Sequence, residues 1–422
     1  MDKKFGLLST ILLGINSIIG FGIFVVPSGI YRYLGAMSVV AYFGVCLLAI
    51  CIALCFAEVA GYFEKNGAAY IYVKEAFGEF WGFEIGMISW IAQIIAWATV
   101  AKVFSEILHE MYSQINVNLL ACALIILLGI INLLGVKSTK YLNNFFTITK
   151  ISVLFVFVIV GAFFIKKANF EPFVGEYFSS NDTISTLSIS FLFIFYVFCG
   201  FENIAMAAKD IQNPKRNLPI AIITVMLCLP FIYTLIQCVC VGILGSDLAE
   251  AKLPLSAAFS KAVGQWGFTF IAIGMLLSTT GIAIALSFLI PRTLQALSSD
   301  GLMPRILGKN SRFEVPYLAI ILTCALACIA IMSKSILELA TITVMVRFFQ
   351  YIPTCIALIV FRSRGLKSAF VVPFGRVFAV IAVICSVYVM INADFTSFKK
   401  CLITFVLIAP FYFLAKRFWQ KA

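Results

Sequence analysis

The sequence predicts an all-α integral membrane protein with about twelve transmembrane helices, of which the first and the sixth are interrupted. Hydrophobic residues make up 62% of the 422 residues and charged residues 12%, against about 45–50% and about 25% in soluble domains. Apolar runs of roughly 20 residues, the length that crosses about 30 Å of hydrocarbon, recur along the chain. Two of these runs contain glycines beside polar residues near their middle.

The apolar runs follow one another with short connections. We expect helices at about residues 7–30, 36–57, 83–101, 117–135, 145–165, 184–206, 219–244, 267–290, 315–333, 337–361, 369–392 and 401–415. The connections leave no room for a soluble domain, so we expect one membrane transport domain over residues 1–422. The first run lacks a small-residue cleavage site, and we therefore do not interpret it as a removed signal peptide.

The distribution of lysines and arginines predicts the orientation in the membrane. Short cytoplasmic loops carry an excess of these residues. Most of the 31 lysines and arginines fall in the terminal segments and in the loops on the same side, so we expect both termini in the cytoplasm. The net charge of +12 is divided among these loops and does not form the single basic face that nucleic-acid binding requires.

Residues for catalysis or metal binding are scarce. The 13 cysteines lie mostly within apolar runs without a paired C-x-x-C set, and we interpret them as small packing residues. The single histidine, His109, falls at the outer end of the third helix, in a solvated position. One histidine and no grouped acids give little material for a metal site or for nucleophilic hydrolysis. We therefore expect neither a metal site nor an enzyme.

The first apolar run is interrupted at residues 16–28, NSIIGFGIFVVPS. Gly20 and Gly22 disfavour a continuous helix, since each glycine costs roughly 1 kcal/mol relative to alanine. In lipid, each freed backbone group costs more unless something binds it. Close packing of small residues is the alternative explanation of the two glycines. Interrupted helices at the bilayer midplane bind charged small molecules, which makes this run a candidate substrate site.

The sixth run has a second interruption at residues 199–203, CGFEN, where a glycine stands next to an acid. Five is an odd number, so two consecutive five-helix units cross the membrane in opposite directions, and helix 6 corresponds to helix 1. We predict a 5+5 inverted-repeat fold with repeats at residues 7–165 and 184–361. Two C-terminal helices follow at residues 369–415. Sites of such transporters lie at the repeat interface.

Several segments carry a family resemblance. They are IIGFGIFVVPSG in helix 1, EVAGYFEKNGAAYIYVKEAFGEFWGF at residues 58–83, the region from NLLGVKSTKY onward, GFENIAMAAKDIQNPKRNLPIAI at helix 6 and PRTLQALSSDGLMP after helix 8. In order and spacing these resemble the amino acid-polyamine-organocation (APC) superfamily of permeases over most of residues 7–310. Helix 5 and the loop after it are most similar to bacterial proton-coupled amino acid transporters related to the cationic amino acid transporters.

The interrupted helices offer groups for both ends of an amino acid zwitterion. Amides that begin the inner half of helix 1 carry the positive end of a helix dipole and suit a carboxylate, whereas carbonyls that end the other half-helices suit an ammonium group. The amide candidates are Gly20, Phe21, Gly22 and Ile23, and the carbonyl candidates are Ser17, Ile18, Phe198, Cys199 and Phe201, beside Gly200. The resemblance implies the same assignment, with a side-chain pocket from helices 3, 6, 8 and 10. Candidate pocket residues are Phe201, Tyr196, Trp97 and Gln93.

Glu202 is an acid within an apolar run, where such residues are rare and functional by default. Three roles stay open from the sequence: Glu202 can face a substrate ammonium, take up a proton, or pair with Arg347 or Lys102. Lys102 lies near the outer end of helix 3, where a snorkelling lysine is expected. Arg347 lies deeper, in helix 10, where it can pair with Glu202 or close a gate.

Lys150 lies early in helix 5. One interpretation is a side chain that snorkels to the cytoplasm, and the other is a lysine held away from water that gains and loses a proton during transport. The resemblance favours the second, because proton-coupled relatives place a lysine amine where sodium-coupled relatives bind an ion between helices 1 and 8. We predict that Lys150 is the proton-coupling site. Its expected neighbours in helix 8 are the hydroxyls of Ser278, Thr279 and Thr280, and the resemblance implies Thr280 above all.

Two positions depart from the family pattern. The family usually has two acids where this chain has Lys209 and Asp210, which bears on substrate release or gating. Asn16 stands beside the helix 1 interruption where small residues are commoner, so its amide either contacts substrate or satisfies a freed backbone group. Arg292 and Asp300 belong to loop segments that resemble family signatures, and we interpret them as cytoplasmic caps and hinges.

The leading prediction is a secondary active amino acid permease of the bacterial inner membrane, a proton-coupled symporter that works by alternating access. An exchanger of an amino acid for its amine or polyamine is the first alternative, and a non-transporting amino acid sensor is the second. The expected partners are a small-molecule amino acid and the lipid bilayer, with the proton as coupling ion and no cofactor. The sequence predicts neither which amino acid is transported nor the oligomeric state.

Overall fold

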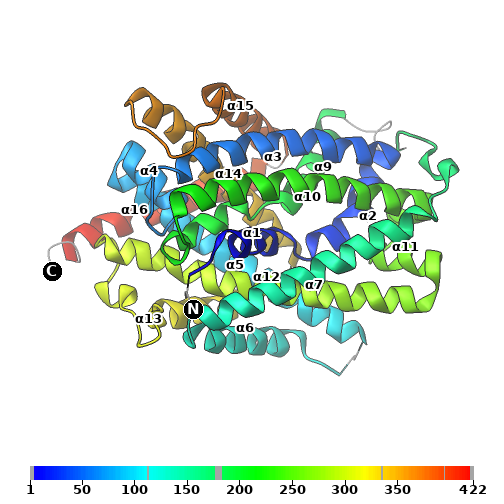
Figure 1. Ribbon diagram of the computed structural model, residues 1–422, viewed down its shortest axis with the longest axis horizontal. Coiled ribbons are helices and arrows are strands. Elements are labelled where there is room, and N and C mark those ends of the chain that lie inside the picture. Colours follow the sequence, from blue (N-terminus) through cyan, green and yellow to red (C-terminus); the bar gives the residue numbers. More distant parts are fainter. Residues whose placement is uncertain (1–3, 112–113, 176–182, 334–335, 394, 419–422) are drawn as a thin grey trace.

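The computed structural model describes residues 4–111, 114–175, 183–333, 336–393 and 395–418, which form a bundle of α-helices with short 3-10 segments (Figure 1). No strand occurs within these ranges, in which one isolated parallel bridge joins Phe5 to Ile211. The predicted all-α class is therefore confirmed. Among the described residues, six stretches are long and apolar enough to cross a membrane: Gly22–Ala60, Glu79–His109, Lys140–Ala162, Ser190–Asp210, Pro214–Glu250 and Gln265–Ser299.

The helices follow the predicted apolar runs. The first half of the chain forms α1 (Leu7–Ile18), α2 (Gly22–Leu34), η1 (Gly35–Met37), α3 (Ser38–Ala60), α4 (Ala69–Phe77), α5 (Glu79–Met111), α6 (Val117–Leu133), α7 (Val136–Ala162) and η2 (Lys167–Phe170). The second half forms α9 (Thr183–Phe198), η3 (Phe201–Asp210), α10 (Pro214–Leu244), η4 (Gly245–Glu250), α11 (Pro254–Val263), α12 (Gln265–Ser299), η5 (Arg305–Gly308), α13 (Tyr317–Ser333) and α14 (Ile336–Ser363). The last two helices are α15 (Gly375–Ala393) and α16 (Phe395–Phe418).

Some helices differ from the predicted runs. α7 begins at Val136, although its apolar run begins near residue 145. Two polar residues before and just after the start of the apolar run are buried against α1: Asn143 accepts a hydrogen bond from Asn16, and Thr147 donates to the Leu12 carbonyl. Polar side chains with such partners do not need water. The short helices α4 and α11 lie in connections that the hydropathy pattern left without structure.

Both predicted interruptions are present. α1 ends at Ile18 and α2 begins at Gly22, while in the sixth run α9 ends at Phe198 and η3 begins at Phe201. Gly200 has a φ of +126°, and a Cβ at this position would clash with the Ser17 carbonyl oxygen. Glycine is required here because it alone accepts this backbone conformation and this close approach. The two interruptions therefore lie directly against each other.

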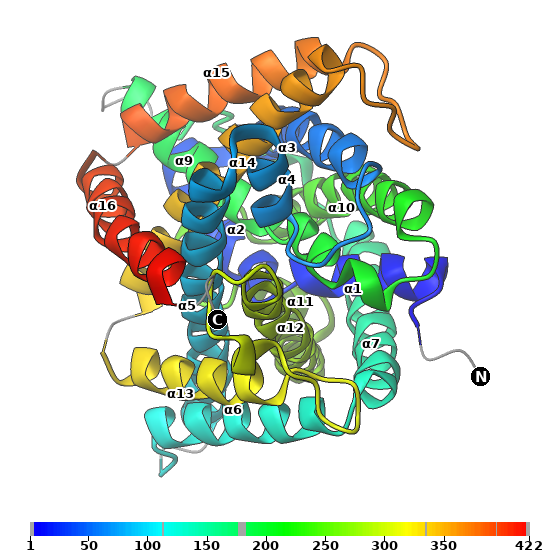
Figure 2. The ribbon, with the colours of Figure 1, turned by 90° about the vertical axis from the view of Figure 1, so that its left-hand side faces the viewer.

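The elements occur in the same order in two parts of the chain. The interrupted helix α1/α2 is followed by a long helix (α3), a short one (α4) and three longer ones (α5–α7), and α9/η3 is followed in the same way by α10, α11 and α12–α14. Figure 2 shows α15 and α16 on the outside of the bundle, and α6 beside α13 along another edge. Nearer the centre lie α2 and α12, which positions the helix 1 interruption inside the protein.

Candidate functional site

A small cavity lies where the two interruptions meet. Its volume is about 40 Å³, and its walls come from the helix 1 interruption, α5, the end of α9, α12 and α14. The lining residues are Ser17, Ile18, Gly20, Phe21, Gly22, Ala96, Val100, Tyr196, Val197, Cys199, Ile282, Leu286 and Arg347. One buried water occupies about 10–15 Å³ of such space, so the cavity holds a few waters and not an amino acid.

The predicted substrate residues divide into two groups. Ser17, Ile18, Gly20, Phe21, Gly22 and Cys199 line the cavity. Ile23, Phe198, Gly200, Phe201 and Glu202 are buried next to them and do not line it. Residues of the first group form part of the cavity wall. Residues of the second group pack behind that wall, next to the two interruptions.

The candidate pocket residues also divide. Tyr196 lines the cavity, and its ring centroid lies 5.9 Å from that of Phe21. Trp97 is buried outside the lining, and Gln93 donates a hydrogen bond to Asn203 Oδ1 at 2.9 Å.

Aliphatic wall residues were missed by the sequence analysis. They are Ala96 and Val100 on α5, and Ile282 and Leu286 on α12. Each pair has the four-residue spacing that places both side chains on one helix face. That spacing was the available signal, but it is shared by many apolar pairs of this chain.

The helix 1 interruption leaves backbone groups available at the cavity. The first N–H groups of α2, at Gly22 and Ile23, have no partner one turn earlier within the helix. Asn16 does not compete for them, because its amide donates to Asn143 Oδ1 at 2.8 Å and to the Gly281 carbonyl at 2.7 Å. Asn16 therefore ties α1 to α7 and α12, and the carbonyl that it bonds belongs to α12 and not to the helix 1 interruption.

Lys150 is fully buried and points into the bundle, which removes the snorkelling interpretation. Its Nζ lies 2.5 Å from the carbonyl oxygen of Ile19, in the helix 1 interruption, and 3.2 Å from that of Ser278 on α12. No carboxylate of the described residues lies within ion-pair distance of this amine. The ammonium group thus bridges α7, α12 and the interruption through carbonyl oxygens alone.

The three hydroxyl residues predicted to lie beside Lys150 are all on α12 and have different partners. Ser278 Oγ lies 3.3 Å from the carbonyls of both Ile19 and Gly20, so it shares an acceptor with Lys150. Thr280 Oγ1 donates to the Leu276 carbonyl of its own helix at 2.8 Å, and Thr279 Oγ1 likewise bonds within α12. Ser278 is therefore the neighbour of Lys150, and the Thr280 hydroxyl is turned to its own backbone.

Glu202 and Arg347 form a buried ion pair that joins η3 to α14. The second carboxylate oxygen of Glu202 accepts hydrogen bonds from Tyr351 Oη and from the Gly200 amide, each at 3.0 Å. Of the three roles left open for Glu202, the structure shows pairing with Arg347. Tyr351, one turn along α14 from Arg347, was missed because a tyrosine in an apolar run carries no charge signal.

Polar contacts gather near the ends of η3 and α12. Arg292 Nε lies 2.5 Å from Asp210 Oδ2, and Phe5 N donates to the Asp210 carbonyl at 2.8 Å. Tyr70 Oη and Lys74 Nζ both donate to Asp300 Oδ2, at 2.5 and 2.7 Å. Burial, together with this hydrogen bond, raises the pKa of the Tyr70 hydroxyl, which therefore remains a donor. These contacts hold the segment before α1 and the helix α4 against the bundle.

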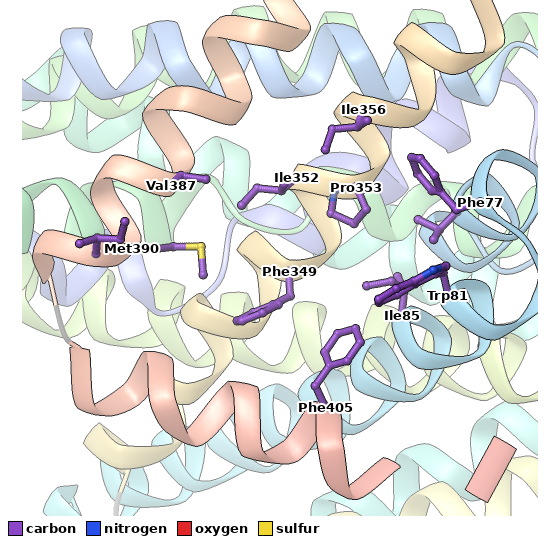
Figure 3. A pocket seen from close by; sticks show the side chains of 12 residues that line it. Phe77, Trp81, Ile85, Phe349, Ile352, Pro353, Ile356, Val387, Met390 and Phe405 are labelled. Atoms are coloured by element: carbon purple, nitrogen blue, oxygen red, sulfur yellow. The ribbon is translucent and has the colours of Figure 1, made fainter. Parts of the chain in front are cut away.

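A larger cavity of about 580 Å³ lies elsewhere, between α4, α5, α14, α15 and α16 (Figure 3). Its walls are apolar side chains such as Trp81, Ile352, Met390 and Phe405, without any charged group or hydroxyl. Ligand sites combine apolar walls with a few convergent polar groups. The smaller cavity has that combination, and the larger one does not.

Interrupted helices, apolar spans and a small cavity where the interruptions meet are the features of a multi-pass membrane transporter. More particularly, the chain belongs to the amino acid permease family, whose model matches residues 5–413. An uncharacterised transporter of Mycobacterium tuberculosis is 30% identical over 93% of this chain and 88% of its own. The branched-chain amino acid permease BcaP of Bacillus subtilis is 24% identical over 100% of this chain and 94% of its own.

A human relative, cationic amino acid transporter 4, is 26% identical over 72% of this chain and 51% of its own. These relatives are named as transporters and permeases. The predicted APC superfamily membership is confirmed, and the chain is a membrane transport protein and not an enzyme.

Proposed function

We propose that this protein is a proton-coupled amino acid symporter of a bacterial inner membrane, with both termini in the cytoplasm. Family membership supports amino acid transport, and the distribution of lysines and arginines supports the orientation. Proton coupling rests on one observation. The buried amine of Lys150 bonds to the Ile19 carbonyl in the helix 1 interruption without a carboxylate beside it.

Lys150 can change its charge only by gaining or losing a proton. When protonated, its ammonium donates to the carbonyls of Ile19 and Ser278 and holds the interruption against α12. Hydrogen bonds from a charged donor are roughly twice as strong as neutral ones. Loss of the proton therefore weakens the hold on Ile19 and frees the interruption to move. Because the same interruption lines the cavity, proton release and substrate release are mechanically linked.

The substrate is held by backbone groups in this proposal. The amides of Gly20–Ile23, in the interruption and at the start of α2, donate hydrogen bonds to the amino acid carboxylate, with the helix dipole in the favourable direction. The carbonyls of Ser17, Ile18, Phe198, Cys199 and Phe201 accept hydrogen bonds from the ammonium group. The meeting of the two interruptions at Gly200 and Ser17 supports this division. Candidates of both kinds line one cavity, namely Ser17, Ile18, Gly20, Phe21, Gly22 and Cys199, and the remaining candidates are buried next to them.

Alternating access follows from two five-helix repeats that move relative to each other. The repeated order of elements supports repeats at residues 7–165 and 184–361, with residues 369–415 outside them. In transporters with inverted repeats the site lies between the repeats, as the cavity between α1/α2 and α9/η3 does here.

Uptake into proteoliposomes tests the coupling. We expect the wild-type protein to accumulate a labelled amino acid in empty vesicles when the outside is acidic. Lys150→Met should reduce the rate of this uptake at least about tenfold. The variant should retain counterflow exchange, because exchange moves no net proton. Lys261→Met is the matched control, since this lysine is exposed and pairs with Asp247 outside the cavity.

Three results would change the proposal. Full pH-driven uptake by Lys150→Met would remove Lys150 as the coupling residue. Flux that depends on internal substrate and ignores the pH gradient would indicate the amino acid/amine exchanger. Specific amino acid binding with no flux would indicate the sensor.

A further inference from the structure

Arg347 is the one charged side chain among the described residues that line the cavity between the interruptions. It reaches this position from α14, and only 6% of its side chain is exposed. A cation fixed at this depth influences which charges can enter, because electrostatic interactions strengthen where water is excluded.

Glu202 cannot serve as an acid for the substrate in this arrangement. Its side chain is 1% exposed and is absent from the cavity wall. One carboxylate oxygen pairs with Arg347, and the other accepts hydrogen bonds from Tyr351 and Gly200. The ion pair is therefore oriented, with its positive end toward the cavity and its negative end enclosed by protein.

The rest of the described side-chain wall carries no formal charge: Ser17, Tyr196 and Cys199 are its polar members, and the other side chains are aliphatic or aromatic. Ala96, Val100, Val197, Ile282 and Leu286 supply the aliphatic part. Among the described residues, no aspartate or glutamate lines this cavity, so a substrate ammonium or guanidinium beyond the α-amino group would find no counter-ion in that part of the wall. Burying an unpaired charge is strongly unfavourable.

We infer that the site accepts neutral amino acids with aliphatic side chains and rejects cationic ones, and that Arg347 determines this selectivity. The inference rests on the proposed function. A lysine or arginine side chain would lie near Arg347 without an acid to pair with, and such built-in repulsion is an effective way to gain specificity. A glutamate or aspartate side chain would compete with Glu202 for Arg347 and leave a buried acid unpaired, which is also unfavourable.

This selectivity separates two groups of relatives. The relatives described above include a branched-chain amino acid permease and a cationic amino acid transporter. Both lie at about the same identity to this chain, so overall similarity does not decide between them. The positive charge of Arg347 at the cavity distinguishes between the two classes, and it favours neutral amino acids as substrates.

Uptake of single labelled amino acids by wild-type proteoliposomes is the first test. The panel contains leucine, valine, lysine, arginine and glutamate. We expect leucine or valine to be taken up at least about tenfold faster than lysine, arginine or glutamate. Faster or equal uptake of a charged amino acid would overturn the inference and leave the proposed function standing. No uptake of any amino acid would overturn the proposed function itself, and the inference with it.

The second test assigns the selectivity to Arg347. The double substitution Arg347→Gln with Glu202→Gln removes both charges together, so that neither partner is left as an unpaired buried ion. We expect lysine to inhibit leucine uptake at least about tenfold more strongly in this variant than in wild type. The matched control is Arg32→Gln with Glu250→Gln, an exposed pair 3.6 Å apart, which should keep wild-type selectivity.

A double variant without flux is examined by ligand-induced thermal stabilisation of the purified protein. Stabilisation by lysine in the variant and not in wild type supports the role of Arg347. Unchanged discrimination against lysine, by uptake or by stabilisation, would overturn it.

Discussion

Lys150 and Arg347 are two buried cations beside the interrupted helices, and they differ in their partners. Arg347 is paired with Glu202, which Tyr351 and Gly200 also hold in place. Within the described residues, Lys150 donates to the carbonyls of Ile19 and Ser278 and to no carboxylate. A carboxylate supplies a full countercharge, whereas a carbonyl supplies only a dipole. The paired cation is therefore suited to a constant charge, and the unpaired one to a charge that changes during transport.

The largest effect on stability is expected at the paired site. Glu202→Gln leaves Arg347 as an unpaired buried charge, which should lower the free energy of unfolding by about 3–5 kcal/mol. Thermal unfolding in detergent measures this change. The double variant with Arg347→Gln should be the more stable of the two, since it removes the remaining charge. If the double variant were as unstable as the single one, the pair would not be the source of the effect.

A smaller loss is expected where the two interruptions meet. Gly200→Ala forces a side chain into a positive φ and against the Ser17 carbonyl, with an expected loss of about 1–3 kcal/mol. Gly44→Ala is the matched control, because nothing lies within 4 Å of a Cβ added there in α3. Equal unfolding temperatures for the two variants would contradict the close contact of the interruptions.

Substitution of Lys150, which has no carboxylate partner among the described residues, should affect transport much more than stability. Lys150→Met replaces a buried ion by an apolar chain of similar length, so we expect a stability change of less than about 1 kcal/mol in either direction. Transport should nevertheless be lost, as proposed above. A loss of stability as large as that of Glu202→Gln would show that the Lys150 charge is structural, and would remove the distinction between the two sites.

The smallest effect is expected for an exposed pair. Arg32 and Glu250 lie 3.6 Å apart with 58% and 84% of their side chains exposed. Arg32→Gln should lower stability by about 0.5 kcal/mol or less, because exposed pairs are screened by water and salt. Thermal unfolding at low and high salt checks this value. A loss comparable to that of Glu202→Gln would mean that burial does not control the strength of these pairs.

The interruptions and their residues were predictable because their signals are local. Glycines within an apolar run and an acid beside Gly200 identified both breaks, and Ser17, Gly20 and Cys199 do line the cavity. The rotation of each helix about its axis was not predictable. It decides that Ser278 and not Thr280 contacts the Lys150 site, and that Ala96 and Ile282 form cavity wall. In helices that are apolar on all sides, the hydrophobic pattern contains little information about this rotation.

By itself, the sequence determined the membrane class, the approximate positions of the long apolar helices, the two interruptions and the family. These depend on composition, on run length and on residues that are neighbours in the chain. Tertiary structure alone decided which buried charges are paired and which of them faces the cavity. Glu202 and Arg347 come from different elements far apart in the sequence, as do Lys150 and Ile19. Their contacts arise only when helices pack, because packing fixes the distance and the direction of each side chain, and those two quantities govern electrostatic energy in a water-free interior.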